Sequence, residues 1–262
     1  MANITVRFYS DCLRRFTTFQ MFLPNEPRPE ASEEEKERKK KKPGLLVFLH
    51  GYTGDAGICV PEPLADRYNF AVVAPNGENG FWLDGISTGH QFGTFLGEEL
   101  PGFVRKTFHL MESPENTCVM GMSMGGFGAI RTALRYPEVY GRGAGMSSAL
   151  IVHEVAEMKE GQGNSVANYE YYRECFGDTV KVLESDNNPE TLVKKLKAGG
   201  KKLPEILMSC GTEDFLLEPN RRFHQFLKDE GVEHVYEEDK GGHDMDFWNK
   251  YIERFIPRMF GE

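Results

Sequence analysis

The sequence predicts an α/β fold in which helices cover both faces of a mostly parallel central sheet. Unbroken apolar runs are typical of strands buried on both faces, and the clearest are Leu45–Leu49, Phe70–Val73, Cys118–Met122 and Ile206–Cys210. Between and after these runs, apolar residues recur at helical spacing in Gln91–Thr107, Gly125–Arg135, Asn220–Asp229 and Met245–Arg258. Strands that alternate with helices in this order indicate a doubly wound sheet.

The remaining strands are predicted at the edges of the sheet. Ile4–Tyr9 and Phe16–Phe22 alternate apolar and polar residues, so we expect them to pair with each other near one edge. Val235–Glu238 is more polar than the central runs, which favours the opposite edge. Pro101 lies inside the helical segment 91–107, and we expect the helix to kink or restart there because proline removes a helix hydrogen bond.

Two segments interrupt the alternation of strands and helices. Residues 28–42 read RPEASEEEKERKKKK. Acidic and basic blocks lie side by side there, which favours a solvated loop over a polybasic docking tract. Residues 151–202 are too long for an ordinary connection. We interpret them as a helical excursion, or cap, that lies over the site within a single domain spanning residues 1–262.

Bulk composition limits the classes of partner. The chain is 40% hydrophobic and 27% charged, which is the balance of a soluble globular protein. Its net charge of −9 would repel nucleic acid and anionic membranes, so we expect neither as a partner. Charges interrupt each apolar run near the N-terminus, and no run approaches the ~20 residues of a membrane span, so we expect a cytoplasmic enzyme. The five cysteines lack metal-ligand spacing, and we expect no metal.

The segment Gly121–Gly125, GMSMG, indicates the nucleophile. It follows a predicted strand and precedes a predicted helix, which is the context of the nucleophile elbow. The turn is so tight that the residues two places either side of the serine must be small. We therefore predict that Ser123 is a catalytic nucleophile, held in a strained conformation above the sheet.

A serine hydroxyl needs a general base, and the base needs a carboxylate that orients it. On this fold the chain order is serine, then acid, then histidine. His243 lies in a glycine-rich loop after the last predicted strand, where the base is expected. Asp214 follows the penultimate strand and is the predicted acid, with Glu213 as its rival.

The loop after the first buried strand, Leu49–Gly54, is the candidate for the oxyanion hole. A loop at this place supplies one backbone N–H, and the residue after the nucleophile supplies the other. We therefore predict that the amides of Tyr52 and Met124 bind the oxyanion.

Five segments together resemble the esterase D and tributyrin esterase group of α/β hydrolases, which also includes feruloyl and acetylxylan esterases. They are FLHGYTGD (48–55), MGMSMGGFGA (120–129), YYRECFGD (171–178), CGTEDFL (210–216) and GGHDMDFW (241–248). The resemblance implies the α/β-hydrolase fold and hydrolysis of short-chain or feruloyl-type esters through an acyl-enzyme, without a cofactor. Members often carry tryptophan two residues after the catalytic histidine, where this chain has Met245.

Several questions stay open at this level. An acyltransferase or an S-formylglutathione-type thioesterase would use the same three residues, whereas a binding protein would not need all of them. The expected partner is a small-molecule ester, and a homo-oligomer is compatible with the sequence. Asp84 is expected either to bind a substrate hydroxyl or to cap a turn. Aromatic candidates for the wall of the substrate pocket are Trp82, Phe92, Tyr172, Phe247 and Trp248.

Overall fold

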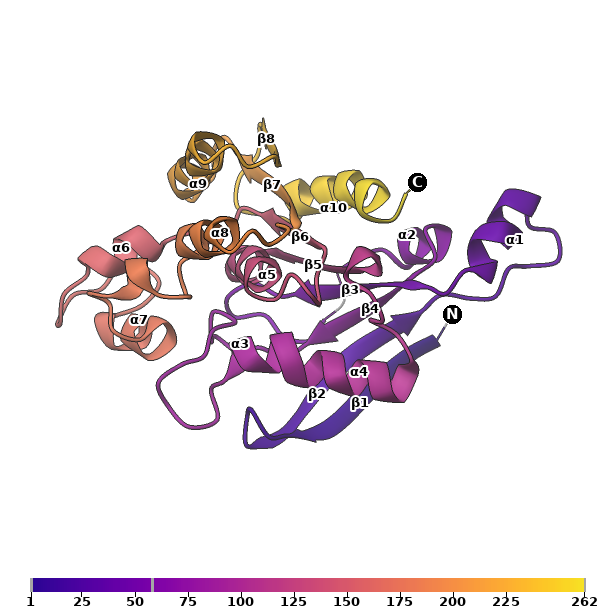
Figure 1. Cartoon of the computed structure of the whole chain (residues 1–262), viewed down its shortest axis with the longest axis horizontal. Helices are drawn as coiled ribbons and strands as arrows, with labels where there is room; N and C mark the ends of the chain where they lie inside the picture. The colour runs from indigo at the N-terminus through magenta and orange to yellow at the C-terminus, as the bar shows by residue number, and fades with distance from the viewer. Residues whose placement is uncertain (1, 58, 262) are drawn as a thin grey trace.

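The computed structural model describes residues 2–57 and 59–261, and these contain one eight-stranded sheet with the order β1-β2-β4-β3-β5-β6-β7-β8 (Figure 1). The strands β1 and β2 pair antiparallel, as do β2 and β4, and all other neighbours are parallel. The predicted α/β-hydrolase fold is thereby confirmed. The strands are β1 (Ala2–Ser10), β2 (Arg15–Leu23), β3 (Gly44–Leu49), β4 (Phe70–Pro75), β5 (Thr117–Met122), β6 (Arg142–Met146), β7 (Glu205–Gly211) and β8 (Val235–Asp239).

Helices cover both faces of the sheet, and the hydrophobic core is divided between the two faces. In β3, Leu45 and Val47 pack into one cluster, while Leu46 packs into the other, as expected for a strand buried on both sides. Within the described part of the chain, each helix is too short or too polar to cross a membrane. The helices are α1 (Glu33–Lys40), α2 (Glu62–Arg67), α3 (Phe92–Thr94), α4 (Leu100–Phe108), α5 (Met124–Arg135), α6 (Val152–Glu157), α7 (Tyr169–Phe176), α8 (Pro189–Ala198), α9 (Leu217–Asp229) and α10 (Met245–Phe260).

Strand β6 was not predicted, because its sequence RGAGM contains no apolar run. Its glycines are required by helix α5, which lies directly against this strand. A Cβ atom at Gly143 would lie 2.8 Å from the Cβ of Ala133, and one at Gly145 would lie 2.8 Å from the Cδ1 of Ile130. Close packing between a helix and a strand therefore removed the sequence signal that the other central strands display.

The predicted helix 91–107 is interrupted as proline requires. It consists of α3, a π-helical turn at Phe95–Glu99 and then α4, in which Pro101 lies in the first turn. A missing N–H is tolerated in the first turn because those groups have no acceptor within the helix. The expected restart at this proline is confirmed.

The charged segment 28–42 is not the loop that we expected, because residues 33–40 form α1, which projects from one end of the sheet (Figure 1). Ser32 caps the helix by accepting a hydrogen bond from the amide of Glu35 at 3.2 Å. Acidic residues occupy the first turn and basic residues the last, which suits the helix dipole. The order of the charges, rather than their number, decides the local structure.

One lysine attaches α1 to the body of the protein. The side chain of Lys39 is 2% exposed, and its Nζ donates to Asp66 Oδ1 at 2.7 Å and to the carbonyl of Asn25 at 2.9 Å. Burial alone would raise the pKa of Asp66, but the hydrogen bonds from Lys39 and from the Asn25 amide outweigh it and lower that pKa.

We expect Lys39→Met to lower the free energy of unfolding by about 1–3 kcal/mol at pH 7, because it leaves a partly buried carboxylate without its cation. The folded-state pKa of Asp66 lies below its ordinary value of 3.8. The ion pair therefore contributes its full stability above about pH 4, and this contribution is lost as the pH falls through the lowered pKa. Urea denaturation at pH 7 and at pH 3 measures both effects. Lys40→Met, at an exposed neighbour, is the matched control and should change stability by less than about 0.5 kcal/mol.

The segment 151–202 contains α6, α7 and α8, and only residues from its first half line the cavity beside Ser123. Helices α6 and α7 extend beyond one end of the sheet, whereas α8 lies beside α5 (Figure 1). Helix α8 therefore belongs to the ordinary helical layer of the fold. The name cap is kept here for residues 151–176, which contain α6 and α7.

Candidate active site

The segment Gly121–Gly125 forms a sharp turn between β5 and α5. Ser123 has φ 54° and ψ −120°, a conformation that side-chain-bearing residues rarely adopt. Its amide donates to the carbonyl of Met146 at 2.9 Å, which ties the turn to β6. A Cβ atom at Gly125 would collide with the carbonyl oxygen of Leu49. The tight turn therefore requires glycine at positions 121 and 125.

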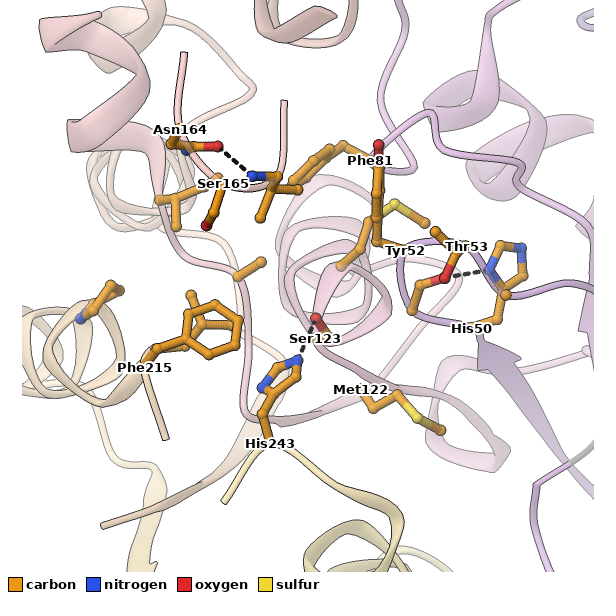
Figure 2. Close-up of a pocket in the computed structure, with 18 of the residues that line it drawn as sticks. His50, Tyr52, Thr53, Phe81, Met122, Ser123, Asn164, Ser165, Phe215 and His243 are labelled. Atoms are coloured by element: carbon orange, nitrogen blue, oxygen red, sulfur yellow. Dashed lines mark hydrogen bonds between the residues drawn. The ribbon is translucent and has the colours of Figure 1, made fainter. Parts of the chain in front are cut away.

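Three residues from distant parts of the chain meet above the carboxyl ends of the strands. The Oγ of Ser123 lies 2.9 Å from His243 Nε2, and Figure 2 shows the two side chains side by side, joined by this hydrogen bond. On the other side of the imidazole, His243 Nδ1 lies 2.9 Å from Asp214 Oδ2. The rival acid Glu213 is exposed to solvent, whereas Asp214 is buried.

Asp214 is held in its ionised form by its neighbours. Burial would raise the pKa of this carboxyl, but hydrogen bonds from His243, from the Leu216 amide and from Ser147 lower it below its ordinary value. The amide of Leu216 donates to Asp214 Oδ1 at 2.8 Å. The indole of Trp248 donates to the Oγ of Ser147 at 3.1 Å, so that hydroxyl is oriented as well.

The two residues whose amides are predicted to form the oxyanion hole line the same cavity as Ser123. Met124 is the first residue of α5, where a helix leaves its amide without an internal acceptor. Tyr52 lies in the loop that follows β3 and lines the same cavity as Ser123. Among residues 2–57 and 59–261, no acceptor binds the amide of Tyr52 or of Met124.

His50 supports this loop as a neutral imidazole. Its Nε2 accepts the amide N–H of Gly77 at 2.9 Å, and its Nδ1 donates to the carbonyl of Gly51 at 2.8 Å. Burial lowers the pKa of His50, so the ring stays uncharged in the state that these two bonds require. His50 therefore has a supporting place in the site and is not a second base.

A cavity of about 840 Å³ opens in front of Ser123. Figure 2 shows Phe215 on one side of Ser123 and Tyr52 on the other. The cap supplies a largely apolar wall, in which Ile151, Val155 and Met158 come from α6 or its flanks. The cavity is thus large compared with an acetyl group and mainly apolar near the serine.

Two of the five aromatic candidates, Tyr172 and Trp248, line this cavity, and the other three are corrected by the structure. Trp82 is fully buried beneath the oxyanion loop, and its indole donates to the carbonyl of His50 at 3.3 Å. Phe92 packs beside Trp82 in the core, with ring centroids 6.5 Å apart. Phe247 lies in the cluster on the opposite face of the sheet. Whether these three side chains point into the cavity or into the core depends on tertiary packing, which the residue type alone does not reveal.

Other wall residues were missed. Phe215 is 69% exposed, yet its ring centroid lies 4.6 Å from that of His243, so it forms part of the rim. It directly follows the predicted acid, and this position was the only signal that could have identified it. Asp84 binds α3 by accepting hydrogen bonds from the amide and the hydroxyl of Thr94, at 2.8 and 2.7 Å. It does not line the cavity.

The fold and the site together define an α/β hydrolase of the serine hydrolase class. The model of a family described as "Putative esterase" matches residues 66–259, and the chain belongs to this family. An acetyl esterase of Caldicellulosiruptor saccharolyticus is 41% identical over 257 residues, which cover 96% of each chain. The resemblance to the esterase group is confirmed, and the protein is an ester-hydrolysing enzyme.

Solved structures with similar folds include two hydrolases of Staphylococcus aureus. The fluorophosphonate-binding serine hydrolase F superposes with a TM-score of 0.83 at 22% identity, covering 100% of this chain and 99% of that one. The S-formylglutathione hydrolase FrmB superposes with a TM-score of 0.80 at 22% identity, covering 99% and 98%. At this identity the comparison supports the fold, and the substrate must be argued from the cavity.

Proposed function

We propose that this protein is a carboxylesterase that hydrolyses short-chain acyl esters through an acyl-enzyme on Ser123. The observation that carries the proposal is the unbroken line from Ser123 through His243 to Asp214, with 2.9 Å at each step, at the floor of a largely apolar cavity. A hydroxyl, an imidazole and a buried carboxylate in this order constitute an activated nucleophile.

In the proposed mechanism, His243 accepts the proton of Ser123 as the serine oxygen bonds to the ester carbonyl carbon. The negative charge that forms on the carbonyl oxygen is bound by the amides of Tyr52 and Met124. His243 then gives its proton to the departing alcohol as the carbon–oxygen bond breaks, leaving the acyl group on Ser123. Water repeats both steps and releases the acid. Asp214 stabilises the imidazolium in each half of the reaction.

The acetyl esterase relative supports a small acyl group. The size of the cavity, about 840 Å³, leaves most of the space for the alcohol part of the ester. Hydroxycinnamoyl esters are the second candidate, because Phe215 at the rim and the apolar wall of α6 suit an aromatic acyl group. Acyl transfer to an alcohol would use the same intermediate and is distinguished by the product.

The charge of the cavity argues against a glutathione thioester. Asp55, Glu154 and Glu218 contribute to the lining, and no lysine or arginine of the described residues does. Arg222 pairs with Glu154 and Arg221 with Glu218 from outside the lining, so only part of this negative charge remains to oppose an anionic substrate. Glutathione carries two carboxylates, and like charges at a binding surface oppose association.

A panel of substrates tests the proposal. We expect turnover of p-nitrophenyl acetate and butyrate, weaker turnover of the octanoate, and a free acid as product when methanol is added as an acceptor. We also expect S-formyl-N-acetylcysteamine to exceed S-formylglutathione in kcat/KM by about tenfold, equal to about 1.4 kcal/mol. The two thioesters share the reacting group and differ in charge. No turnover of any ester would contradict the proposal, and a preference for the glutathione compound would favour the thioesterase.

A further inference from the structure

The loop that carries Tyr52 has a conformation that its own sequence does not favour. Thr53 has φ 64°, in the left-handed region, which a β-branched residue rarely adopts. Such a residue keeps this conformation only where its surroundings hold it. Thr53 itself is exposed, so the packing of its side chain is not what holds it. The restraint must come from hydrogen bonds.

The turn that follows β4 supplies these hydrogen bonds on both sides of Tyr52. Before Tyr52, the amide of Gly77 donates to the ring of His50 at 2.9 Å. After Tyr52, the amide of Thr53 donates to the side-chain Oδ1 of Asn79 at 2.8 Å. The Tyr52 amide therefore lies between two anchored points, and the anchor next to it depends on a single side chain.

Asn79 is in turn fixed by the cap. Its backbone carbonyl accepts the hydroxyl of Tyr171 at 2.5 Å and lies 3.5 Å from the Sγ of Cys175, and both residues belong to α7. The ring of Tyr171 also contacts the ring of Tyr52 edge to face, with centroids 5.8 Å apart. Burial raises the pKa of Tyr171, so the hydroxyl stays a donor. Helix α7 thus contacts both the loop and the residue that anchors it.

We infer that Asn79 is a positioning residue of the oxyanion hole, which aims the Tyr52 amide through Thr53, and that Tyr171 of α7 holds Asn79 in place. This rests on the proposed role of the Tyr52 amide. The cap then has two roles, because α7 both lines the cavity and helps to hold the oxyanion loop in position. A hole that is loosened binds the oxyanion less well, while binding of the ground-state ester is little changed.

The test compares Asn79→Ala with the wild type, using active sites counted by titration with a fluorophosphonate. Deleting an oxyanion donor lowers kcat by about 10²–10³-fold, so loosening one should lower it by about tenfold, with KM within about twofold. The Ki of a trifluoromethyl ketone, which forms a tetrahedral adduct, should rise by the same factor as kcat falls. A variant that only folds less well would have fewer titrated sites but an unchanged Ki.

Tyr171→Phe removes one hydroxyl and should lower kcat about threefold or more, with the same rise in Ki. The reason is that a less firmly held Tyr52 amide stabilises the oxyanion less well. It carries the test if Asn79→Ala does not fold. Tyr169→Phe is the matched control, because it removes from the same helix a hydroxyl that makes no hydrogen bond to any described residue. The double variant should resemble Asn79→Ala alone, because Tyr171 acts through the missing side chain.

An unchanged kcat per titrated site in Asn79→Ala, or a lower kcat with an unchanged Ki, would overturn the inference. Ser123→Ala separates this from a failure of the proposed function. If Ser123→Ala is inactive while Asn79→Ala behaves as wild type, only the role of Asn79 is wrong. If Ser123→Ala keeps its turnover, the acyl-enzyme proposal and the inference fall together.

Discussion

Replacing Ser123 with alanine should lower kcat for p-nitrophenyl acetate by about 10⁴–10⁶-fold, the range seen when a triad nucleophile is removed. The remaining groups can polarise the carbonyl but have no atom with which to form the acyl-enzyme. The Cβ is kept, so the strained turn at φ 54° and its bond to Met146 should persist, and the melting temperature should change by less than a few degrees. Steady-state kinetics and thermal unfolding measure the two effects.

The matched control is Ser165→Ala, at a second serine on the wall of the same cavity. We expect it to lower kcat by at most about tenfold, because no histidine or carboxylate among the described residues hydrogen-bonds to the hydroxyl of Ser165. Equal losses in the two variants would mean that turnover depends on the cavity in general, and this outcome would contradict the assignment of Ser123.

Asp214→Asn should lower kcat by about 10⁴-fold while leaving KM nearly unchanged. The carboxylate fixes the proton on Nδ1 of His243, so that Nε2 faces Ser123 as an acceptor, and an amide can favour the opposite tautomer. Burial would raise the pKa of Asp214, but its hydrogen bonds hold that pKa below the ordinary value. The stability that these bonds contribute is therefore present above about pH 4 and is lost as the pH falls through the lowered pKa.

Glu213→Gln provides the control for this prediction, since it removes a neighbouring carboxylate that is exposed. Its kcat should stay within about twofold of the wild type, because an exposed charge is screened by solvent. If Glu213→Gln lost as much activity as Asp214→Asn, the acid would have been assigned to the wrong residue.

The sequence alone predicted the elements whose structure is determined by a short, local pattern of residues. The apolar runs of β3, β4, β5 and β7 are visible because parallel strands are covered on both faces. The elbow is visible because its backbone forces glycine at fixed distances from Ser123. The chain order of the triad then selected Asp214 and His243 from many acids and seven histidines.

Features that depend on tertiary packing were not predicted. Strand β6 has glycines where α5 approaches it, so hydrophobicity could not reveal it. Trp82 lies 32 residues from His50 in the sequence, yet it packs directly beneath the oxyanion loop in the core and supports it there. Helix α1 is a different case, because Ser32 followed by Glu35 is a capping signal that the high charge of the segment concealed.

The two hydrogen bonds on either side of Tyr52 also depend on tertiary packing and could not be predicted from the sequence. Asn79 lies 26 residues from Thr53 and 92 from Tyr171, and nothing in the sequence links the three positions. A turn containing asparagine and glycine predicts only a change of chain direction. The contact of the cap with the oxyanion loop is thus a property of the folded chain, and it is the reason to test α7 as a support of catalysis.

The most direct test of the central claim is the site of the covalent intermediate. The protein is mixed with p-nitrophenyl butyrate, quenched in acid within the first turnovers, digested with trypsin and analysed by mass spectrometry. The account predicts a butyryl group on the peptide Thr107–Arg131, with fragment ions that place it on Ser123 and no adduct in Ser123→Ala. A butyryl group on another residue, or an adduct that persists in Ser123→Ala, would contradict it.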